Sequence, residues 1–334
     1  MSRRCRGGEL RLAAALAAVL LATMPAAPRA QAPPARMTRA WPVMGTMFVA
    51  TAWGRDTAVL LRAVHAAHDS VRLVDSLMSN YRPGSDVSRL NAGAGAAAQR
   101  VSSQTLHVLL QARRFWRLSG GLFDPTVGPF VRAWGFYGDS GRVPTRAEID
   151  SLRPLVGYGR VELDSAGGTV RLPIPGMSLD LGGIAKGYAL DLARAALRDP
   201  AISGGMLDLG GNLLVFGRPP RGSRWIVGIR DARRDGRIIG TVAIDSGAVA
   251  TSGDYEHYFR IGGVRYGHLI DPTTGFPRRG VLSATAVGPT GEWSDGLSGA
   301  LFLAGATRGA AIADSLHGTA GIWLVDRARA AVRP

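Results

Sequence analysis

Apolar residues recur every three or four positions over Thr57–Met78, which predicts a long amphipathic helix. The same spacing near residues 103–119, stopped by a glycine pair, predicts a second helix. Thr145 and Glu148 have capping-box spacing and open a short third helix. Three further helices are expected over residues 184–197, 295–303 and 307–316.

Alternating apolar and polar residues predict strands, beginning with residues 44–53. Residues 161–172 have the pattern of a hairpin that turns at two glycines. The other expected strands are 177–181, 206–209, 225–229, 238–244, 255–261 and 321–326. Because strands and helices are mixed without regular alternation, we expect an α+β fold: mixed sheets with flanking helices, in one compact unit or two intimate subdomains.

The first 32 residues are typical of a secretory signal peptide. They have a basic start, an apolar run rich in alanine and leucine, and the small-residue site Ala30-Gln31-Ala32. An uncleaved anchor is the alternative. Cys5 precedes the apolar run, so a lipid-modified cysteine is not expected. Residues 33–40 are predicted to be a linker and residues 41–330 the functional domain, in a periplasmic or secreted protein.

Composition narrows the chemistry. Cys5 is the only cysteine, so a chain cleaved after residue 32 has no thiol chemistry, disulfide or cysteine–metal site. Cleavage also removes five arginines and one glutamate, which lowers the net charge from +15 to +11. That excess suits an anionic ligand. The arginines are scattered and no aromatic residues accompany them, so a nucleic-acid partner is not expected.

Lys186 is the only lysine among 40 basic residues, and it follows the glycine pair of the segment Asp180–Tyr188. An ammonium group is a compact charge that fits beside a phosphate where a planar guanidinium does not. Glycines at a turn before a helix expose backbone N–H groups that bind phosphate. A lysine retained by chance at the surface is the alternative.

Three more loops combine glycine with aspartate. They contain Asp124, Asp254 and Asp271, and a further aspartate, Asp295, follows downstream. We interpret Asp271 as a turn residue that bonds to its own backbone. Helix capping and metal binding are equally good interpretations of Asp295. Two histidines of the first helix, His65 and His68, are interpreted as surface or packing residues.

Taken in order, these motifs resemble the FAD:protein FMN transferases, also called the ApbE family. The resemblance runs from Met44 to Leu303. It includes Met-Gly-Thr, Met-Ser-Asn-Tyr, Phe-Asp-Pro-Thr, Asp-Leu-Gly-Gly-Ile-Ala-Lys-Gly-Tyr, Thr-Ser-Gly-Asp-Tyr and His-Leu-Ile-Asp-Pro-Thr-Thr-Gly. It implies Mg²⁺-dependent attack of a Thr or Ser hydroxyl of an acceptor flavoprotein on the FMN-side phosphorus of FAD, with loss of AMP. Acceptors associated with the membrane are expected.

The resemblance also implies roles for individual residues. The flavin nucleotide would contact Met44, Tyr81, Leu122, Phe123, Asp124, Asp180, Lys186 and Ile270. Mg²⁺ would lie between the Gly183 carbonyl and the Asp295 carboxylate. Asp295 would also take the proton of the incoming hydroxyl, and His268 is the alternative base, since imidazole titrates near neutral pH.

One position departs from the family pattern. The family usually has a threonine four residues after this aspartate, and here the position is Gly299, preceded by Ser298. Either Ser298 substitutes as a metal ligand, water fills the gap, or the metal binds more weakly. The alternative functions are FAD hydrolysis to FMN and AMP, and non-catalytic binding of FAD in the periplasm.

Overall fold

The computed structural model describes residues 34–138 and 140–326, and those from Ala35 onwards belong to one compact unit. The predicted signal peptide lies outside the described residues. Residues 35–40, predicted to be part of a linker, are instead the beginning of strand β1 (Ala35–Val43). Every residue of β1 pairs with the next strand, β2 (Thr46–Gly54), so the hairpin register accounts for the difference.

The centre of the fold is a seven-stranded sheet with the order β1-β2-β6-β7-β10-β15-β16. All its neighbouring strands are antiparallel. Beyond β1 and β2, its strands are β6 (Ile202–Leu209), β7 (Asn212–Gly217), β10 (Gly247–Gly253), β15 (Val281–Gly288) and β16 (Ala320–Val325). The mixture of sheets and helices confirms the predicted α+β class.

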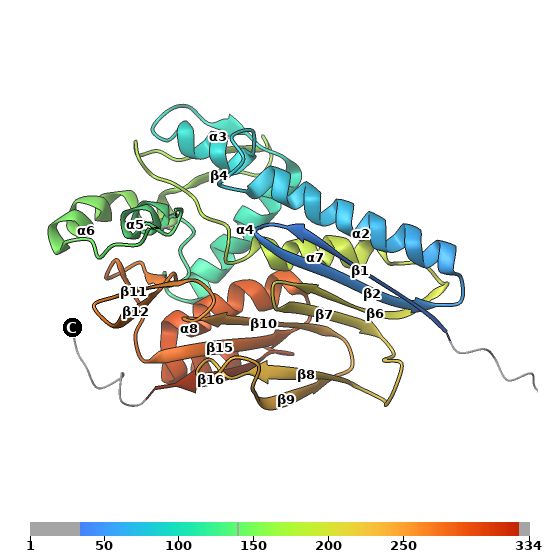
Figure 1. The fold of residues 1–334 in the computed structure, drawn as a ribbon. Coiled ribbons are helices and arrows are strands. Elements are labelled where there is room, and N and C mark those ends of the chain that lie inside the picture. Colours follow the sequence, from blue (N-terminus) through green and yellow to red (C-terminus); the bar gives the residue numbers. More distant parts are fainter. Residues whose placement is uncertain (1–33, 139, 327–334) are drawn as a thin grey trace, which may run out of the picture. The chain divides into compact units, whose positions relative to one another are not determined.

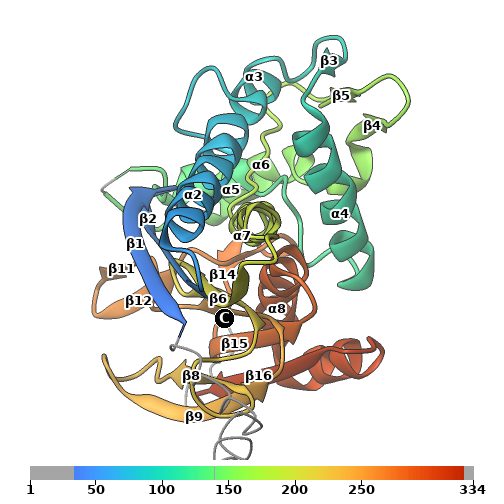
Figure 2. The ribbon, with the colours of Figure 1, turned by 90° about the vertical axis from the view of Figure 1, so that its right-hand side faces the viewer.

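Three helices cover one face of this sheet (Figures 1 and 2). They are α2 (Thr57–Met78), α7 (Ala185–Ala196) and α8 (Gly291–Asp314). Their apolar residues form the main core with the inward side chains of the sheet, such as Phe48 and Leu207. The other face is covered by the hairpin of β8 (Trp225–Arg230) and β9 (Ile238–Ile244) through a second apolar cluster.

The chain between α2 and α7 forms a separate group of helices and short strands beside the sheet (Figure 1). Its helices are α3 (Asp86–Ala92), α4 (Ser103–Leu118), α5 (Gly128–Trp134), α6 (Arg146–Leu152), η1 (Arg153–Leu155) and η2 (Tyr158–Arg160). Its strands are β3 (Gln99–Arg100), β4 (Glu162–Asp164) and β5 (Thr169–Arg171). The predicted capping box of α6 and the predicted hairpin of β4 and β5 are both confirmed.

Two small hairpins complete the structure near this group. They pair β11 (Tyr258–Ile261) with β12 (Val264–Gly267), and β13 (Ile270–Asp271) with β14 (Phe276–Pro277). The strand predicted from residue 255 therefore begins three residues later, after a turn. An aromatic cluster around Trp134 packs against both hairpins.

The strand predicted over residues 177–181 is wrong. This segment is an extended loop whose N–H groups bond outside any sheet: Leu179 donates to the side chain of Asn91 at 2.7 Å, and Asp180 donates to the Pro125 carbonyl at 2.7 Å. The loop therefore connects α3 and the Pro125 turn to the glycines that precede α7.

The two helices predicted over residues 295–303 and 307–316 form one element, α8, with a break at Gly305. Gly305 has φ 74° and ψ 174°, a backbone conformation that glycine adopts readily and that is costly for other residues. Within the described residues, α8 is the one helix long and apolar enough to cross a membrane. However, 67% of that apolar window is buried inside the fold, as in the core helix of a folded domain.

Candidate functional site

The turn before α7 places a carboxylate, two glycines and the single lysine within a few ångströms. Asp180 accepts the Gly182 N–H at 2.8 Å, and the Lys186 ammonium donates to the Gly182 carbonyl at 3.0 Å. Both glycines are exposed, and the residue at the N-cap of α7, Ile184, makes no side-chain cap bond. The exposed turn, the positive end of the helix dipole and the nearby ammonium form an environment suited to a phosphate.

Asp295 lies on the first turns of α8 and is only 5% exposed. It is not the helix cap, because Thr290 has that role. Its Oδ2 accepts the Gly187 N–H of α7 at 2.8 Å, and none of the described residues donates a hydrogen bond to its Oδ1. The Ser298 hydroxyl donates to the Asp295 carbonyl at 2.8 Å and lies 2.9 Å from the Ser252 hydroxyl of β10.

The ring of Phe123 brings the two elements together. A Cβ placed on Gly183 would lie 3.3 Å from this ring, and one placed on Gly299 would lie 3.7 Å from it. The glycine turn and the α8 residues after Asp295 therefore adjoin the same side chain. Gly183, Asp295 and Ser298, the three residues predicted to hold the metal, thus belong to neighbouring parts of one site.

The donors of Gly183, Asp295, Ser298 and Ser252 are all hard oxygen atoms: one backbone carbonyl, one carboxylate and two hydroxyls. No cluster of three or more His, Cys, Asp or Glu side chains suited to a metal occurs within residues 34–138 and 140–326. Mg²⁺ typically needs only one or two carboxylates together with substrate phosphates. The donor set therefore fits Mg²⁺ held jointly with a phosphate ligand, and it does not fit a metal bound by the protein alone.

Tyr81 lies at the rim of a cavity of about 470 Å³ that also includes Tyr137, Asn91 and Arg132. Its side chain is 71% exposed and faces Tyr137 edge-on, with ring centroids 6.2 Å apart. The Tyr137 hydroxyl donates to Asp180 at 2.9 Å, so the cavity adjoins the glycine turn. Burial and this carboxylate both raise the pKa of Tyr137, which keeps its hydroxyl protonated as a donor.

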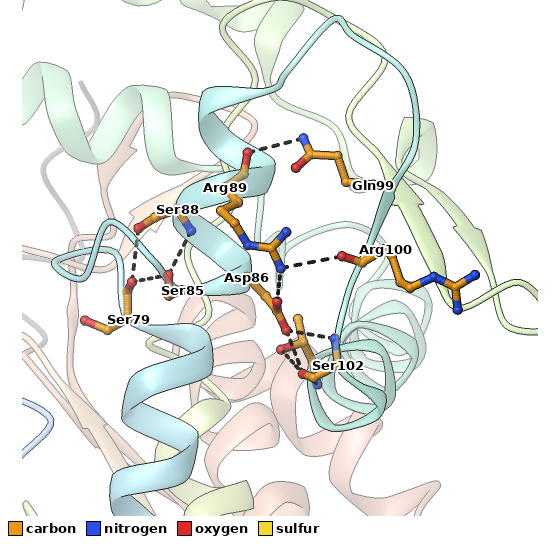
Figure 3. A network of polar contacts seen from close by, with 9 residues as sticks. Ser79, Ser85, Asp86, Ser88, Arg89, Gln99, Arg100 and Ser102 are labelled. Carbon is orange, nitrogen blue, oxygen red and sulfur yellow. Dashed lines mark hydrogen bonds and ion pairs between the residues drawn. The ribbon is translucent and has the colours of Figure 1, made fainter.

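The loop that carries Tyr81 is held by a polar network (Figure 3). The hydroxyls of Ser85 and Ser88 both donate to the Ser79 carbonyl, at 2.7 and 3.2 Å. Asp86 accepts from the Ser102 N–H and hydroxyl and pairs with Arg89. These bonds fix the loop between α2 and α3 on the start of α4, which leaves the exposed Tyr81 ring on a rigid support.

The predicted flavin contacts of the Phe-Asp-Pro-Thr loop lie mostly inside the protein. Leu122 and Phe123 are buried in the main core. Asp124 is also buried, and its carboxylate accepts the N–H groups of Thr126 at 2.8 Å and Tyr158 at 2.9 Å. Burial raises the pKa of Asp124. These bonds make Asp124 a support of the loop, and its contact with a nucleotide remains a prediction.

His268 is partly exposed, and its Nδ1 lies 3.1 Å from the His257 carbonyl. Since a carbonyl only accepts, Nδ1 carries the proton and Nε2 keeps a free lone pair. Burial, together with the charges of His257 and Lys186, lowers the pKa of His268 to about 4, although the hydrogen bond to the His257 carbonyl acts in the opposite direction. The imidazole near Lys186 is therefore neutral at pH 7, and it can accept a proton there as a weak base.

Ile270 is buried among the aromatic residues around Trp134, directly after the loop of His268. The turn interpretation of Asp271 is confirmed, because its carboxylate accepts the Thr273 N–H at 2.8 Å and the Thr273 hydroxyl at 2.6 Å. The packing interpretation of His65 and His68 is also confirmed: both rings contact Trp41, with centroids 5.5 and 4.4 Å away.

Met44 occupies the turn between β1 and β2 with φ 52°, and it is the only non-glycine among the described residues with a positive φ. Together with Gly45 it forms a two-residue hairpin turn, a place where asparagine or glycine is usual. A methionine held in this conformation costs about 1 kcal/mol or more, and such strain is concentrated at functional sites. The adjacent strand β2 begins with Thr46, at the rim of a second cavity of about 440 Å³.

Three residues of this region were given no role in the sequence analysis. Tyr137 bonds to Asp180, Ser252 pairs with Ser298, and Asp191 of α7 accepts two N–H groups at the start of α8. Asp191 lies one helical turn after Gly187, on the same face of α7. That spacing is the signal that could have identified it.

Comparison with known proteins is consistent with this geometry. The chain matches the ApbE family over residues 44–323. A FAD:protein FMN transferase of Vibrio cholerae is 38% identical over 248 residues, which cover 72% of this chain and 73% of that protein. One of Treponema pallidum is 32% identical over 306 residues, 86% of this chain and 84% of that protein. The crystal structure of the ApbE protein of Thermotoga maritima has a TM-score of 0.80 at 32% identity and covers 87% of this chain and 94% of that one.

Proposed function

The chain belongs to the ApbE family, and on that premise we propose that it is a FAD:protein FMN transferase, an enzyme that moves FMN from FAD to an acceptor flavoprotein. The observation that carries this proposal is the meeting of two parts at Phe123. One is the exposed glycine turn with Lys186, and the other is the oxygen-rich segment of Asp295, Ser298 and Ser252.

The finer chemistry is part of the proposal. The hydroxyl of a Thr or Ser of the acceptor forms a bond to the FMN-side phosphorus of FAD, the pyrophosphate bond breaks, and AMP leaves. Gly183, Asp295 and Ser298 would hold Mg²⁺. When bound, the ion would neutralise charge on the pyrophosphate, as in phosphoryl transfer generally.

This chain's own residues would bind and orient the nucleotide. The Lys186 ammonium and the N–H groups at the start of α7 would lie beside the pyrophosphate. Tyr81 and Tyr137 would contact a ring of FAD at the cavity rim. The two candidates for the base are Asp295, with Oδ1 free of hydrogen bonds from the described residues, and His268, whose Nε2 has a free lone pair.

The test is the intact mass of an acceptor flavoprotein domain after incubation with the purified chain, FAD and Mg²⁺, with chelator in a parallel reaction. A Mg²⁺-dependent gain of one FMN per acceptor, with release of one AMP, supports the proposal. FMN and AMP free in solution would instead indicate a FAD pyrophosphatase. Intact FAD bound to an unreactive chain would indicate a non-catalytic FAD-binding protein, the outcome that Gly299 in place of threonine favours.

Replacing Asp295 by Asn tests the metal assignment. Asp295→Asn keeps the size of the side chain and removes its charge, so we expect FAD binding to persist and turnover to be lost. His268→Asn is the matched variant for the alternative base: if His268 takes the proton, this variant loses turnover but keeps Mg²⁺ binding. Normal turnover by Asp295→Asn would contradict the assignment of the metal ligand.

We also propose that the enzyme acts outside the cytoplasmic membrane on acceptors that are associated with it. The support is the predicted signal peptide of residues 1–32, which lies outside the described residues. Fractionation of cells that express the full chain tests the location. Recovery of the enzyme in the cytoplasm, with residues 1–32 still attached, would contradict it.

A further inference from the structure

Asp191 joins α7 to the beginning of α8. Its Oδ1 accepts the Gly291 N–H at 2.7 Å, and its Oδ2 accepts the Glu292 N–H at 2.8 Å. These are the first two N–H groups of α8, which have no partner within their own helix. A third N–H group, that of Trp293, donates to the hydroxyl of Thr290, the N-cap residue of α8. The start of α8 is therefore held by one side chain of another helix and one of its own.

A second bond runs in the opposite direction between the same helices. Asp295 of α8 accepts the Gly187 N–H of α7. Gly187 and Asp191 are one turn apart on α7, and Gly291 and Asp295 are one turn apart on α8. Two carboxylates, one from each helix, thus bond to the backbone of the other helix, and each fixes the position of its partner.

Glycines allow the two helices to approach this closely. A Cβ on Gly187 would overlap with the Gly291 carbonyl and lie 2.6 Å from Cβ of Asp295. A Cβ on Gly291 would in turn overlap with the Gly187 carbonyl. The helix backbones are therefore in direct contact at this level, so a small shift of α8 along α7 moves the Asp295 carboxylate by the same amount.

We propose that Asp191 is a positioning residue for the Asp295 carboxylate: it fixes the first turn of α8 on α7, so that Oδ2 remains on Gly187 and Oδ1 stays available at the glycine turn. We assign Asp191 this role and not that of a ligand because each of its oxygens accepts an N–H group of α8. The part of this inference that concerns metal binding rests on the proposed function. The part that concerns the arrangement of α7 and α8 does not depend on the proposed function.

Electrostatics explain why a second carboxylate is tolerated here. Burial raises the pKa of Asp191, and the charge of Asp295 contributes in the same direction. The two N–H groups offset this, since the N-terminus of a helix carries about half a positive charge. Removing these bonds would release the first two N–H groups of α8 and leave the bond from Gly187 to Asp295 as the remaining hydrogen bond between the two helices within the described residues.

The test compares Asp191→Asn with Thr290→Ala. Asp191→Asn keeps the shape but replaces one acceptor by a donor, so it breaks one of the two bonds that link Asp191 to α8 and faces the second N–H with a donor. Thr290→Ala removes a bond at the same helix end and leaves the link intact. The first measurement is hydrogen exchange at the Gly187 amide in metal-free protein. The second is Mn²⁺ affinity in the presence of FAD, followed by the Mn²⁺ EPR signal.

In Asp191→Asn, we expect Gly187 to exchange at least tenfold faster. Mn²⁺ should bind about 10- to 100-fold more weakly, as is typical when a group that orients a metal ligand is lost. The FAD affinity of Asp191→Asn should remain within twofold of wild type. In Thr290→Ala, the exchange rate of Gly187 and the Mn²⁺ affinity should also remain within twofold of wild type. Should Asp191→Asn not fold, Asp191→Glu, which retains two acceptor oxygens on a longer stem, is expected to show the same changes in part.

Wild-type exchange and Mn²⁺ affinity in Asp191→Asn would overturn the inference. Equal changes in Thr290→Ala would also overturn it, because they would mean that any loosening of the start of α8 is enough to expose the Gly187 amide and weaken Mn²⁺ binding. If wild type binds no Mn²⁺ but Asp191→Asn still exposes the Gly187 amide, the positioning role is supported and the metal assignment of the proposed function fails.

Discussion

Glu292 is a buried acid whose ionisation should destabilise the fold. It is 9% exposed, and burial raises its pKa from an ordinary value near 4.5 to about 7. His107 of α4, 3.1 Å from Oε2, opposes this shift, whereas Asp191 and Asp295 add to it. Tyr188 of α7 also faces Glu292, and its own pKa is raised in part by that carboxylate. Oε1 is buried without a hydrogen-bond partner among the described residues.

The sign follows from proton binding. Between pH 4.5 and 7 the unfolded chain releases the proton of Glu292 while the folded protein keeps it. Stability should therefore be fully present below pH 4.5 and fall as the pH rises through 7. At 1.36 kcal/mol for each pKa unit, the cost of ionising Glu292 in the folded protein reaches about 3 kcal/mol above pH 7.

Glu292→Gln removes this cost and keeps the size of the side chain. We expect the variant to be about 3 kcal/mol more stable than wild type at pH 8 and equal to it near pH 4.5. The measurement is urea unfolding of both proteins in EDTA across this range. EDTA excludes any effect of metal on the nearby Asp295.

The matched control is Glu148→Gln. Glu148 is exposed in the capping box of α6, and its bond from Arg142 lowers its pKa to about 2. Its ionised form stabilises the fold, so the substitution should destabilise the protein at pH 8, the opposite sign. The reasoning about Glu292 is refuted if Glu292→Gln is no more stable than wild type at pH 8, or if its advantage is the same at pH 4.5.

Three further substitutions test the site. Gly299→Thr should fit, since its Cβ would meet only ordinary contacts at 3.7 Å or more, and the added hydroxyl should lower the Mg²⁺ concentration needed for half-maximal turnover. Gly187→Ala should destabilise the protein by about 1–3 kcal/mol in urea unfolding and weaken Mn²⁺ binding, because the new methyl forces the helices apart. Lys186→Arg keeps the charge but not the compact shape, and a loss of about tenfold in kcat/KM is expected; an unchanged value would mean that the lysine is there by chance.

The sequence predicts best those elements whose apolar positions repeat regularly. The helix over Thr57–Met78 begins and ends at its predicted residues. Its eight buried residues recur at the three- to four-residue spacing of an amphipathic helix, which is the pattern that predicted it. Residues 177–181 show the limit of this approach. Their alternation of apolar and polar residues is typical of a strand. However, their partners are Asn91 and Pro125, far away along the chain, and such contacts leave no local pattern.

The same distinction holds for the site. Motif order predicts that Gly183, Lys186 and Asp295 belong to one centre, and the contacts of Phe123 with Gly183 and Gly299 are consistent with this. The spacing of Asp191 after Gly187 places it near the site, but its role depends on N–H groups a hundred residues later in the chain, which leave no local pattern. The burial of Asp124 was missed for a similar reason: its partner Tyr158 is 34 residues away.

The position of β6 beside β2 also sets an order of events during synthesis. The two strands are neighbours in the sheet, although about 150 residues lie between Trp53 and its contact Ser203. Until residue 209 has left the ribosome, the hairpin of β1 and β2 has both edges open and no sheet to join. Closing so long a loop is slow, because its entropy is lost before the contacts form. The strands on which α7 packs, β6 and β7, therefore join the sheet only after residue 209 has been made, and the Asp295 segment of the candidate site is added later still, so the full site is completed late in synthesis.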